Sequence, residues 1–177
     1  MSFKELKITR LSSQSSARYL SFILFLSIQF LSYSQDSLHD LLEKYNKESV
    51  RYIYVSELAK IQSDVVILDA REPGEYNVSH IKDAIPVGFN NFNNNVLNEI
   101  NQDTVIVVYC SLGVRSERIG EKIKKLGYSV YNLYGGIFEW KNSGYDVYDT
   151  NNKITENVHA YSEEWSKWLL KGNKIYD

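Results

Sequence analysis

Short apolar runs alternate with amphipathic segments along most of the chain. The runs VVILDA at residues 65–70 and TVIVVYC at residues 104–110 are apolar and rich in β-branched side chains, which is typical of strands buried on both faces of a parallel sheet. The second run is the more strongly apolar, so we expect it to form the central strand. Shorter extended segments are predicted at residues 51–55, 84–89 and 129–134.

Helical signals separate these strands. Residues 115–127 place Ile119, Ile123 and Leu126 at helical spacing, with lysines in the last turn and Gly127 as the stop signal. Pro73 marks the start of another helix. Further short helices are predicted within residues 36–50, within residues 56–61 with Ser56 as N-cap, within the asparagine-rich residues 90–103, and within residues 135–144.

The tail also has helical spacing. Five apolar residues would lie on one side of a helix, namely Val158, Tyr161, Trp165, Trp168 and Leu169. This face either packs on the domain or binds a partner.

The alternation of strands and helices predicts an α/β fold, in which a central parallel sheet of about five strands has helices on both faces. The chain has 177 residues, enough for one domain. Ligands in such folds bind beyond the carboxyl ends of the strands. Cys110 lies at one such end.

The first 34 residues differ in character from the rest. Basic residues precede a mostly apolar run at residues 19–31, and the small residues Ser32 and Ser34 follow it. The run is shorter than the roughly 20 residues of a membrane-spanning helix, so an uncleaved anchor is the weaker interpretation. We expect a signal peptide at residues 1–34, export to the periplasm or cell envelope, and no stable membrane insertion after cleavage.

The composition excludes several kinds of site. The formal charge is −2, so the chain lacks the basic character of a nucleic-acid-binding protein. Its three histidines are scattered and show no metal-ligand spacing, so we expect no metal. Cys110 is the only cysteine, which excludes an internal disulfide. A free thiol is unusual in an exported protein, so Cys110 is either buried as a small apolar side chain or used in chemistry.

The loop after Cys110 favours chemistry. Backbone N–H groups of the next residues would surround the sulfur, and the start of the following helix adds positive potential. Gly113 can adopt a positive φ. The N–H groups and the charge of Arg115 favour a thiolate, so we expect the pKa of Cys110 to be lowered.

Three motifs together resemble the single-domain rhodanese-like proteins, of the thiosulfate sulfurtransferase type. YCSLGVRS at residues 109–116 resembles the family's active-site loop, in which a cysteine opens a six-residue cradle. ILDAREPGEYNVSHIKDAIPV at residues 67–87 is similar to its amino-terminal signature, and LYGGIFEWKNSGYDV at residues 133–147 to its carboxyl-terminal signature. The resemblance implies a rhodanese-like three-layer fold.

The resemblance also divides the chain. It covers residues from about 50 to 148, so we expect a rhodanese-like domain at residues 51–148. Helical extensions are then expected on either side of it, at residues 35–50 and 149–177.

The resemblance further implies sulfur transfer. Cys110 would take a sulfur atom from thiosulfate or a persulfide donor and hold it as a persulfide until a thiol or cyanide accepts it. The cradle would bind the substrate through Ser111, Leu112, Gly113, Val114, Arg115 and Ser116. Arg71 either lies near the substrate or only forms a structural ion pair with Asp69. No cofactor is implied. The partners would be a small sulfur-donor anion and a thiol acceptor, which can be a thiol-carrying protein, and we expect a monomer.

Alternatives remain open at this point. The spacing C-x-x-x-x-R is one residue shorter than the loop of cysteine phosphatases, which disfavours phosphatase activity. Thiosulfate-preferring members often have a basic residue where this chain has Ser111, so the donor is open. A non-catalytic binding or sulfur-delivery module, or a redox sensor, could use the same loop. Glu75 and His80 are interpreted as groups that hold the fold, and Trp140 as a core residue.

Overall fold

Within residues 37–176, the part of the chain that the computed structural model describes, five parallel strands form one sheet in the order β1-β5-β4-β2-β3. The strands are β1 (Arg51–Ile53), β2 (Val66–Asp69), β3 (Ile85–Pro86), β4 (Ile106–Tyr109) and β5 (Val130–Leu133). β4 is the central strand, as predicted, and all four of its residues are buried. The predicted signal peptide at residues 1–34 lies outside the described residues.

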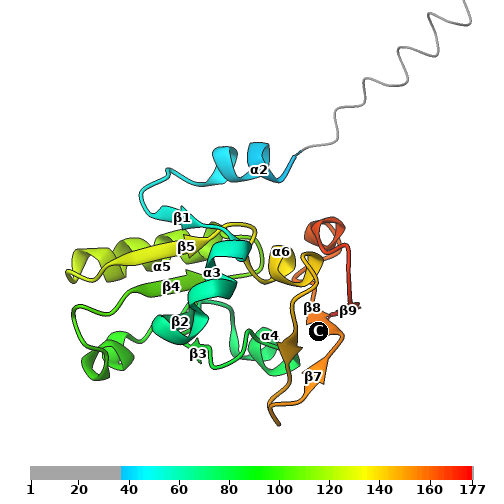
Figure 1. The fold of residues 1–177 in the computed structure, drawn as a ribbon. Coiled ribbons are helices and arrows are strands. Elements are labelled where there is room, and N and C mark those ends of the chain that lie inside the picture. The colour runs from blue at the N-terminus through cyan, green and yellow to red at the C-terminus, as the bar shows by residue number, and fades with distance from the viewer. Residues whose placement is uncertain (1–36, 177) are drawn as a thin grey trace, which may run out of the picture. The chain divides into compact units, whose positions relative to one another are not determined.

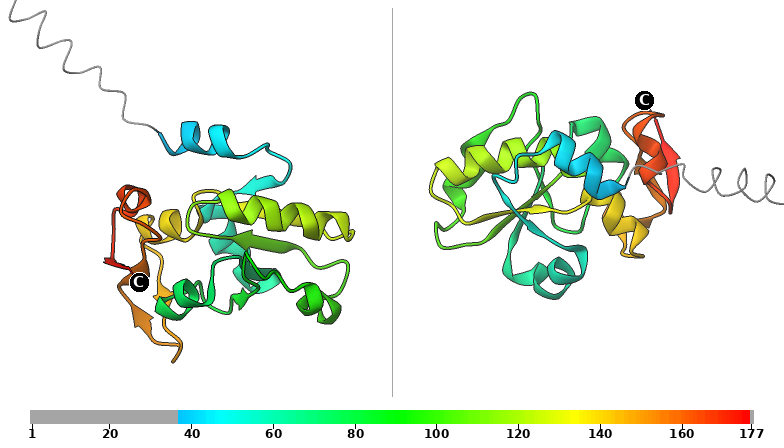
Figure 2. Two further views of the ribbon diagram at one scale, coloured as in Figure 1. Left: turned by 180° about the vertical axis from the view of Figure 1, so that it is seen from behind. Right: turned by 90° about the horizontal axis from the view of Figure 1, so that it is seen from above.

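Helices cover both faces of this sheet, which confirms the predicted α/β fold. The helical elements are α2 (Leu38–Tyr45), α3 (Val55–Ile61), α4 (Pro73–Val78), α5 (Val114–Lys125), α6 (Gly136–Asn142) and the 3-10 helices η1 (Gln62–Asp64), η2 (Asn94–Glu99) and η3 (Trp165–Trp168). Figure 2 shows α5 on one side of the sheet and α3 on the other. Val107 and Tyr109 of β4 pack in the cluster with α3 and α6, whereas Ile106 and Val108 pack in the cluster with α5 and η2.

The helix boundaries largely follow the sequence signals. α5 begins directly after Gly113 and ends shortly before Gly127, and both glycines have positive φ. α3 differs, because its N-cap is Tyr54 and not the predicted Ser56. The carboxylate of Glu57 accepts a hydrogen bond of 2.9 Å from the backbone N–H of Tyr54, so this acid begins the helix earlier.

The C-terminal extension is not the helix that its spacing predicted. β6 (Val147–Tyr148) pairs with β7 (Ile154–Thr155), β8 (Asn157–His159) pairs in parallel with β9 (Asn173–Ile175), and only η3 is helical between them. The reason is the backbone: Tyr161 has a φ of 67°, a left-handed conformation that a helix does not continue through.

This extension folds back beside α6 (Figure 1). The amide of Asn142 at the end of α6 donates to the carbonyl of Trp168 at 2.9 Å, and its oxygen accepts from the N–H of Leu170 at 2.7 Å. Lys141 forms an ion pair of 2.8 Å with Glu156. The tail is therefore packed on the domain near the carboxyl end of the sheet. Among residues 37–176, no helix is long and apolar enough to cross a membrane.

Candidate active site

Cys110 follows the central strand β4 directly and opens the loop that leads into α5. Gly113 closes this loop with a φ of 110°, and its N–H donates to Sγ of Cys110 at 3.1 Å. Two buried amides fix the opposite side of Gly113: its carbonyl accepts from Nδ2 of Asn132 at 2.7 Å and from Nδ2 of Asn46 at 3.0 Å. The loop is thus held in a shape that places a backbone donor on the sulfur.

The glycine pair at the start of α6 holds the other side of the loop. The N–H of Ile137 donates to the carbonyl of Cys110 at 2.9 Å, and the N–H of Phe138 donates to the carbonyl of Ser111 at 3.2 Å. A Cβ atom at Gly136 would overlap the carbonyl oxygen of Cys110 and lie 2.7 Å from that of Ser111. Only glycine at position 136 lets the two segments approach this closely. Trp140, farther along α6, is buried in the core as predicted.

The surroundings of Cys110 favour its ionised form. Burial by itself raises the pKa of the thiol, but the positive charge of Arg115 lowers it, as do hydrogen bonds from the Ser116 hydroxyl and from the N–H groups of Ser116 and Gly113. The net result is a pKa below the ordinary value of a cysteine. The sulfur is therefore a candidate nucleophile, although it is almost fully buried.

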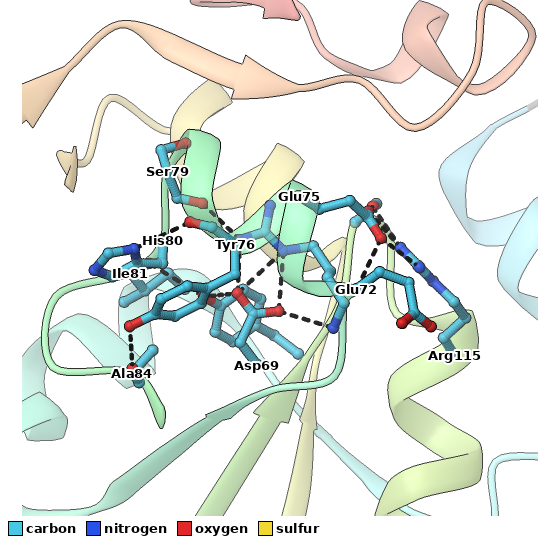
Figure 3. Close-up of polar contacts among 12 residues, drawn as sticks. Asp69, Glu72, Glu75, Tyr76, Ser79, His80, Ile81, Ala84 and Arg115 are labelled. Atoms are coloured by element: carbon cyan, nitrogen blue, oxygen red, sulfur yellow. Dashed lines mark hydrogen bonds and ion pairs between the residues drawn. The ribbon is translucent and has the colours of Figure 1, made fainter. Parts of the chain in front are cut away.

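Glu75 fixes Arg115 beside the loop (Figure 3). The two side chains form a bidentate ion pair with N–O distances of 2.6 and 2.7 Å. The Arg115 side chain is only 14% exposed and that of Glu75 only 6%. The hydroxyl of Ser111 donates to Glu75 at 3.1 Å, and the backbone N–H of Glu72 donates to it at 3.0 Å. Burial by itself raises the pKa of Glu75, but the hydrogen bonds and positive charge of Arg115 lower it by more, so the pKa lies below its ordinary value.

The sequence assigned Glu75 to the fold alone, and the structure adds that it positions the cation of the candidate site. Glu75 and Arg115 are 40 positions apart, so no local pattern around Cys110 could have indicated their pairing. Glu75 lies inside the amino-terminal signature at residues 67–87, and this was the one sequence signal that could have pointed to a role at the site.

Arg71 lies elsewhere. Its guanidinium is fully buried, pairs with Asp69 at 2.6 Å and donates to the carbonyl of Ser79 at 2.6 Å. Asp69 also accepts from the hydroxyl of Tyr109 at 2.6 Å. Arg71 therefore forms the ion pair with Asp69, and it lines neither of the two cavities near Cys110. His80 is likewise buried and pairs through its backbone.

A small cavity of about 90 Å³ opens onto the sulfur. It is lined by Cys110, Ser111, Leu112, Val114, Arg115, Tyr161 and Trp165. Five of these belong to the predicted loop, whereas Gly113 and Ser116 contact the sulfur without lining the cavity. Tyr161 and Trp165 come from the C-terminal extension, and their helical spacing did not indicate that they would line this cavity.

A larger cleft adjoins this cavity. It has a volume of about 510 Å³ and shares Val114, Arg115 and Tyr161 with the smaller one. Its further lining includes Glu72, Phe89, Asn90, Arg118 and His159. In residues 37–176, no three His, Cys, Asp or Glu side chains are grouped so that they could hold a metal ion.

Solved structures resemble this architecture. A rhodanese-related protein from Thermoplasma volcanium is 28% identical, with a TM-score of 0.51 over 55% of this chain and 96% of that one. A thiosulfate sulfurtransferase from Pseudomonas aeruginosa has a TM-score of 0.53 over 70% of this chain and 24% of that one. At 20% identity, the second likeness shows the fold alone.

Curated proteins resemble the same region of the chain. The tRNA uridine(34) hydroxylase of Aster yellows witches'-broom phytoplasma is 37% identical over 86 residues, which are 45% of this chain and 28% of that protein. The probable adenylyltransferase/sulfurtransferase MoeZ of Mycobacterium tuberculosis is 37% identical over 79 residues, 43% of this chain and 20% of that protein. The chain thus matches less than a third of each of these two relatives.

The family assignment rests on the segment that contains the site. Residues 54–143, just over half of the chain, match the Rhodanese-like domain family. This segment includes the loop after Cys110, the acid Glu75 and the glycine pair at the start of α6. The chain belongs to the rhodanese-like domain family.

Proposed function

We propose that the protein is a sulfurtransferase that carries sulfur as a persulfide on Cys110. One observation carries the proposal: a cysteine with a lowered pKa faces a small cavity, and its sulfur accepts a hydrogen bond from a backbone N–H. A thiol that served only in packing would not need Arg115 fixed beside it by a bidentate ion pair.

The first half-reaction loads the cysteine. The Cys110 thiolate attacks the outer sulfur of thiosulfate, a sulfur–sulfur bond forms, and the bond within thiosulfate breaks so that sulfite leaves with its electron pair. The product is a Cys110 persulfide anion. The N–H of Gly113 and the charge of Arg115 lie where they can stabilise this anion.

The second half-reaction unloads the cysteine. A thiolate or cyanide ion attacks the outer sulfur of the persulfide, that sulfur bonds to the acceptor, and the electron pair of the broken bond returns to Cys110 as a thiolate. Both steps are displacements at sulfur that need no external oxidant or reductant, so the proposed reaction needs no redox cofactor.

The donor and the location of the enzyme are part of the proposal. Ser111 donates to Glu75 and adds no positive charge, so a persulfide donor is as compatible with the loop as thiosulfate. The pattern of residues 1–34 supports action in the periplasm or cell envelope. The resemblance to MoeZ, a probable adenylyltransferase/sulfurtransferase, supports the reaction class, although the match covers only 20% of that protein.

Intact mass spectrometry tests the proposal directly. The reduced protein is incubated with thiosulfate or with a low-molecular-weight persulfide, and the mass is read before and after cyanide. We expect a species heavier by one sulfur atom that cyanide removes, and we expect Cys110→Ser to lack it.

A second measurement separates catalysis from packing. The serine variant should melt close to the wild-type temperature, because oxygen for sulfur is a small change in volume. Failure of both donors to form an adduct on a folded protein would contradict the proposal and favour a non-catalytic binding or sulfur-delivery module.

A further inference from the structure

Two aromatic side chains of the C-terminal extension complete the wall of the cavity over Cys110. Tyr161 and Trp165 both line this cavity, yet both lie beyond residues 54–143, the segment that matches the family. The nucleophile and its cover therefore come from different parts of the chain.

Several contacts fix these two rings in place. The guanidinium of Arg115 lies 4.6 Å from the ring centre of Tyr161. The ring of Trp165 lies 6.1 Å from that of Tyr161 and 5.6 Å from that of Tyr45 in α2. The pairing of β8 with β9 closes the segment that carries both rings. Tyr161, which is 47% exposed, is thus held between Arg115 and Trp165 at the mouth of the cavity, and Trp165 is held between Tyr161 and Tyr45.

The size of the half-open space over the sulfur limits what can bind within it. One water takes about 30 Å³ of liquid volume, so about 90 Å³ corresponds to roughly three waters. A cavity of about 150 Å³ in another protein is known to hold a benzene ring. The space over Cys110 therefore suits a donor of a few heavy atoms and is smaller than a cavity that encloses an aromatic ring.

Tyr161 also lies where this cavity meets its larger neighbour, together with Val114 and Arg115. Its side chain lines both the 90 Å³ cavity and the 510 Å³ cleft. Truncation of this ring should therefore widen the approach to the sulfur from the side of the larger cleft.

We propose that Tyr161 and Trp165 determine donor specificity, by admitting small sulfur donors such as thiosulfate and excluding aromatic donors and persulfides carried on folded proteins. This inference rests on the proposed sulfurtransferase function. It assigns specificity to the C-terminal extension and reactivity to the loop after Cys110.

Competition between a small and an aromatic donor tests the inference. Benzenethiosulfonate transfers its outer sulfur to the Cys110 thiolate and releases benzenesulfinate, so its chemistry parallels that of thiosulfate. We expect the ratio of kcat/KM for benzenethiosulfonate to that for thiosulfate to rise at least about tenfold in Tyr161→Ala and in Trp165→Ala. Tyr176→Ala is the matched control, because this tyrosine of the same extension is 44% exposed and lines neither space. Its ratio should equal that of the wild type.

Alkylation gives a readout that does not depend on sulfur transfer. Cys110 is the only cysteine, so intact mass reports its modification alone. We compare the alkylation rate with a bulky fluorescein maleimide to the rate with iodoacetamide at the same pH. Both reagents react with the thiolate, so the ratio of the two rates does not depend on the thiolate fraction and reports how well a bulky reagent reaches Cys110. This ratio should rise in both alanine variants and stay constant in Tyr176→Ala.

The outcomes separate the two proposals. If no protein forms a persulfide but the alkylation ratio rises, the sulfurtransferase proposal fails and the rings still control access. If persulfides form and both ratios stay at wild-type values in folded variants, the specificity inference is overturned. Should an alanine variant not fold, Tyr161→Leu and Trp165→Leu keep an apolar contact, and the same two ratios decide.

Discussion

The ion pair between Glu75 and Arg115 offers the sharpest test of the site's construction. Glu75→Gln keeps the size of the side chain and removes its charge, so Arg115 loses the partner that holds it at 2.6 and 2.7 Å. Loss of one partner costs roughly 3 to 5 kcal/mol in a buried ion pair, and an exposed pair is worth only about 0 to 1 kcal/mol. With side chains 14% and 6% exposed, this pair lies near the buried limit.

The expected loss of stability follows from these values. The amide oxygen of glutamine still accepts one of the two hydrogen bonds, so we expect the free energy of unfolding to fall by about 2 to 3 kcal/mol. For a protein of this length, that corresponds to a decrease of about 4 to 12 °C in Tm. Urea unfolding followed by circular dichroism measures the first quantity, and thermal unfolding the second.

Glu57→Gln is the matched control. Glu57 and Glu75 occupy the same position at the start of α3 and α4, and each accepts a hydrogen bond from the N-cap backbone. Glu57, however, forms no salt bridge within the described residues. The difference between the two variants therefore reports what Glu75 contributes beyond capping, namely the buried ion pair with Arg115 and the hydrogen bond from Ser111, and equal losses of stability would refute the reasoning.

The pH dependence gives a second check on the same pair. Burial raises the pKa of Glu75, but Arg115 lowers it by more, so the folded-state pKa lies below the ordinary value of 4.5. The carboxylate thus stabilises the fold above its unfolded-state pKa, and this contribution is lost as the pH falls through the folded-state pKa. The stability gap between the wild type and Glu75→Gln should narrow as the pH falls below about 4.5. A gap that is constant with pH would contradict the assignment.

Two further substitutions test the loop itself. Arg115→Gln removes the charge that opposes the effect of burial on Cys110, so we expect the pH midpoint of iodoacetamide alkylation to move upward, and an unchanged or lower midpoint would contradict this role. Gly136→Ala should lower the free energy of unfolding by about 2 kcal/mol more than Gly88→Ala, as measured by urea unfolding. Both glycines have positive φ, but a Cβ at Gly88 meets nothing closer than 4.0 Å, so equal losses would rule out a steric cause.

The elements that local pattern specifies were predictable. The central position of β4 follows from its continuous apolar run, because a strand buried on both faces needs apolar side chains throughout. The limits of α5 follow from Gly113 and Gly127, because glycine is favoured where the backbone has a positive φ. The place of Cys110 at the end of β4 follows from the same run.

The features that depend on long-range packing were not predictable. Tyr161, Trp165 and Trp168 have helical spacing, but strand pairing and the left-handed backbone at Tyr161 prevail over that periodicity. Arg71 illustrates a different limit. Its sequence position is compatible with binding or with a structural role, and its full burial against Asp69 is a packing feature that the local sequence does not reveal.

Under the two proposals, reactivity and access depend on different contacts. The groups that lower the pKa of Cys110, namely Gly113, Arg115 and Ser116, all belong to the loop and the first turn of α5. Arg115 is held mainly by Glu75, because two charge-assisted hydrogen bonds outweigh a ring contact with Tyr161 worth about 0.5 to 2 kcal/mol. Replacement of the tail should therefore change which donors reach the sulfur while the thiolate remains available to attack them.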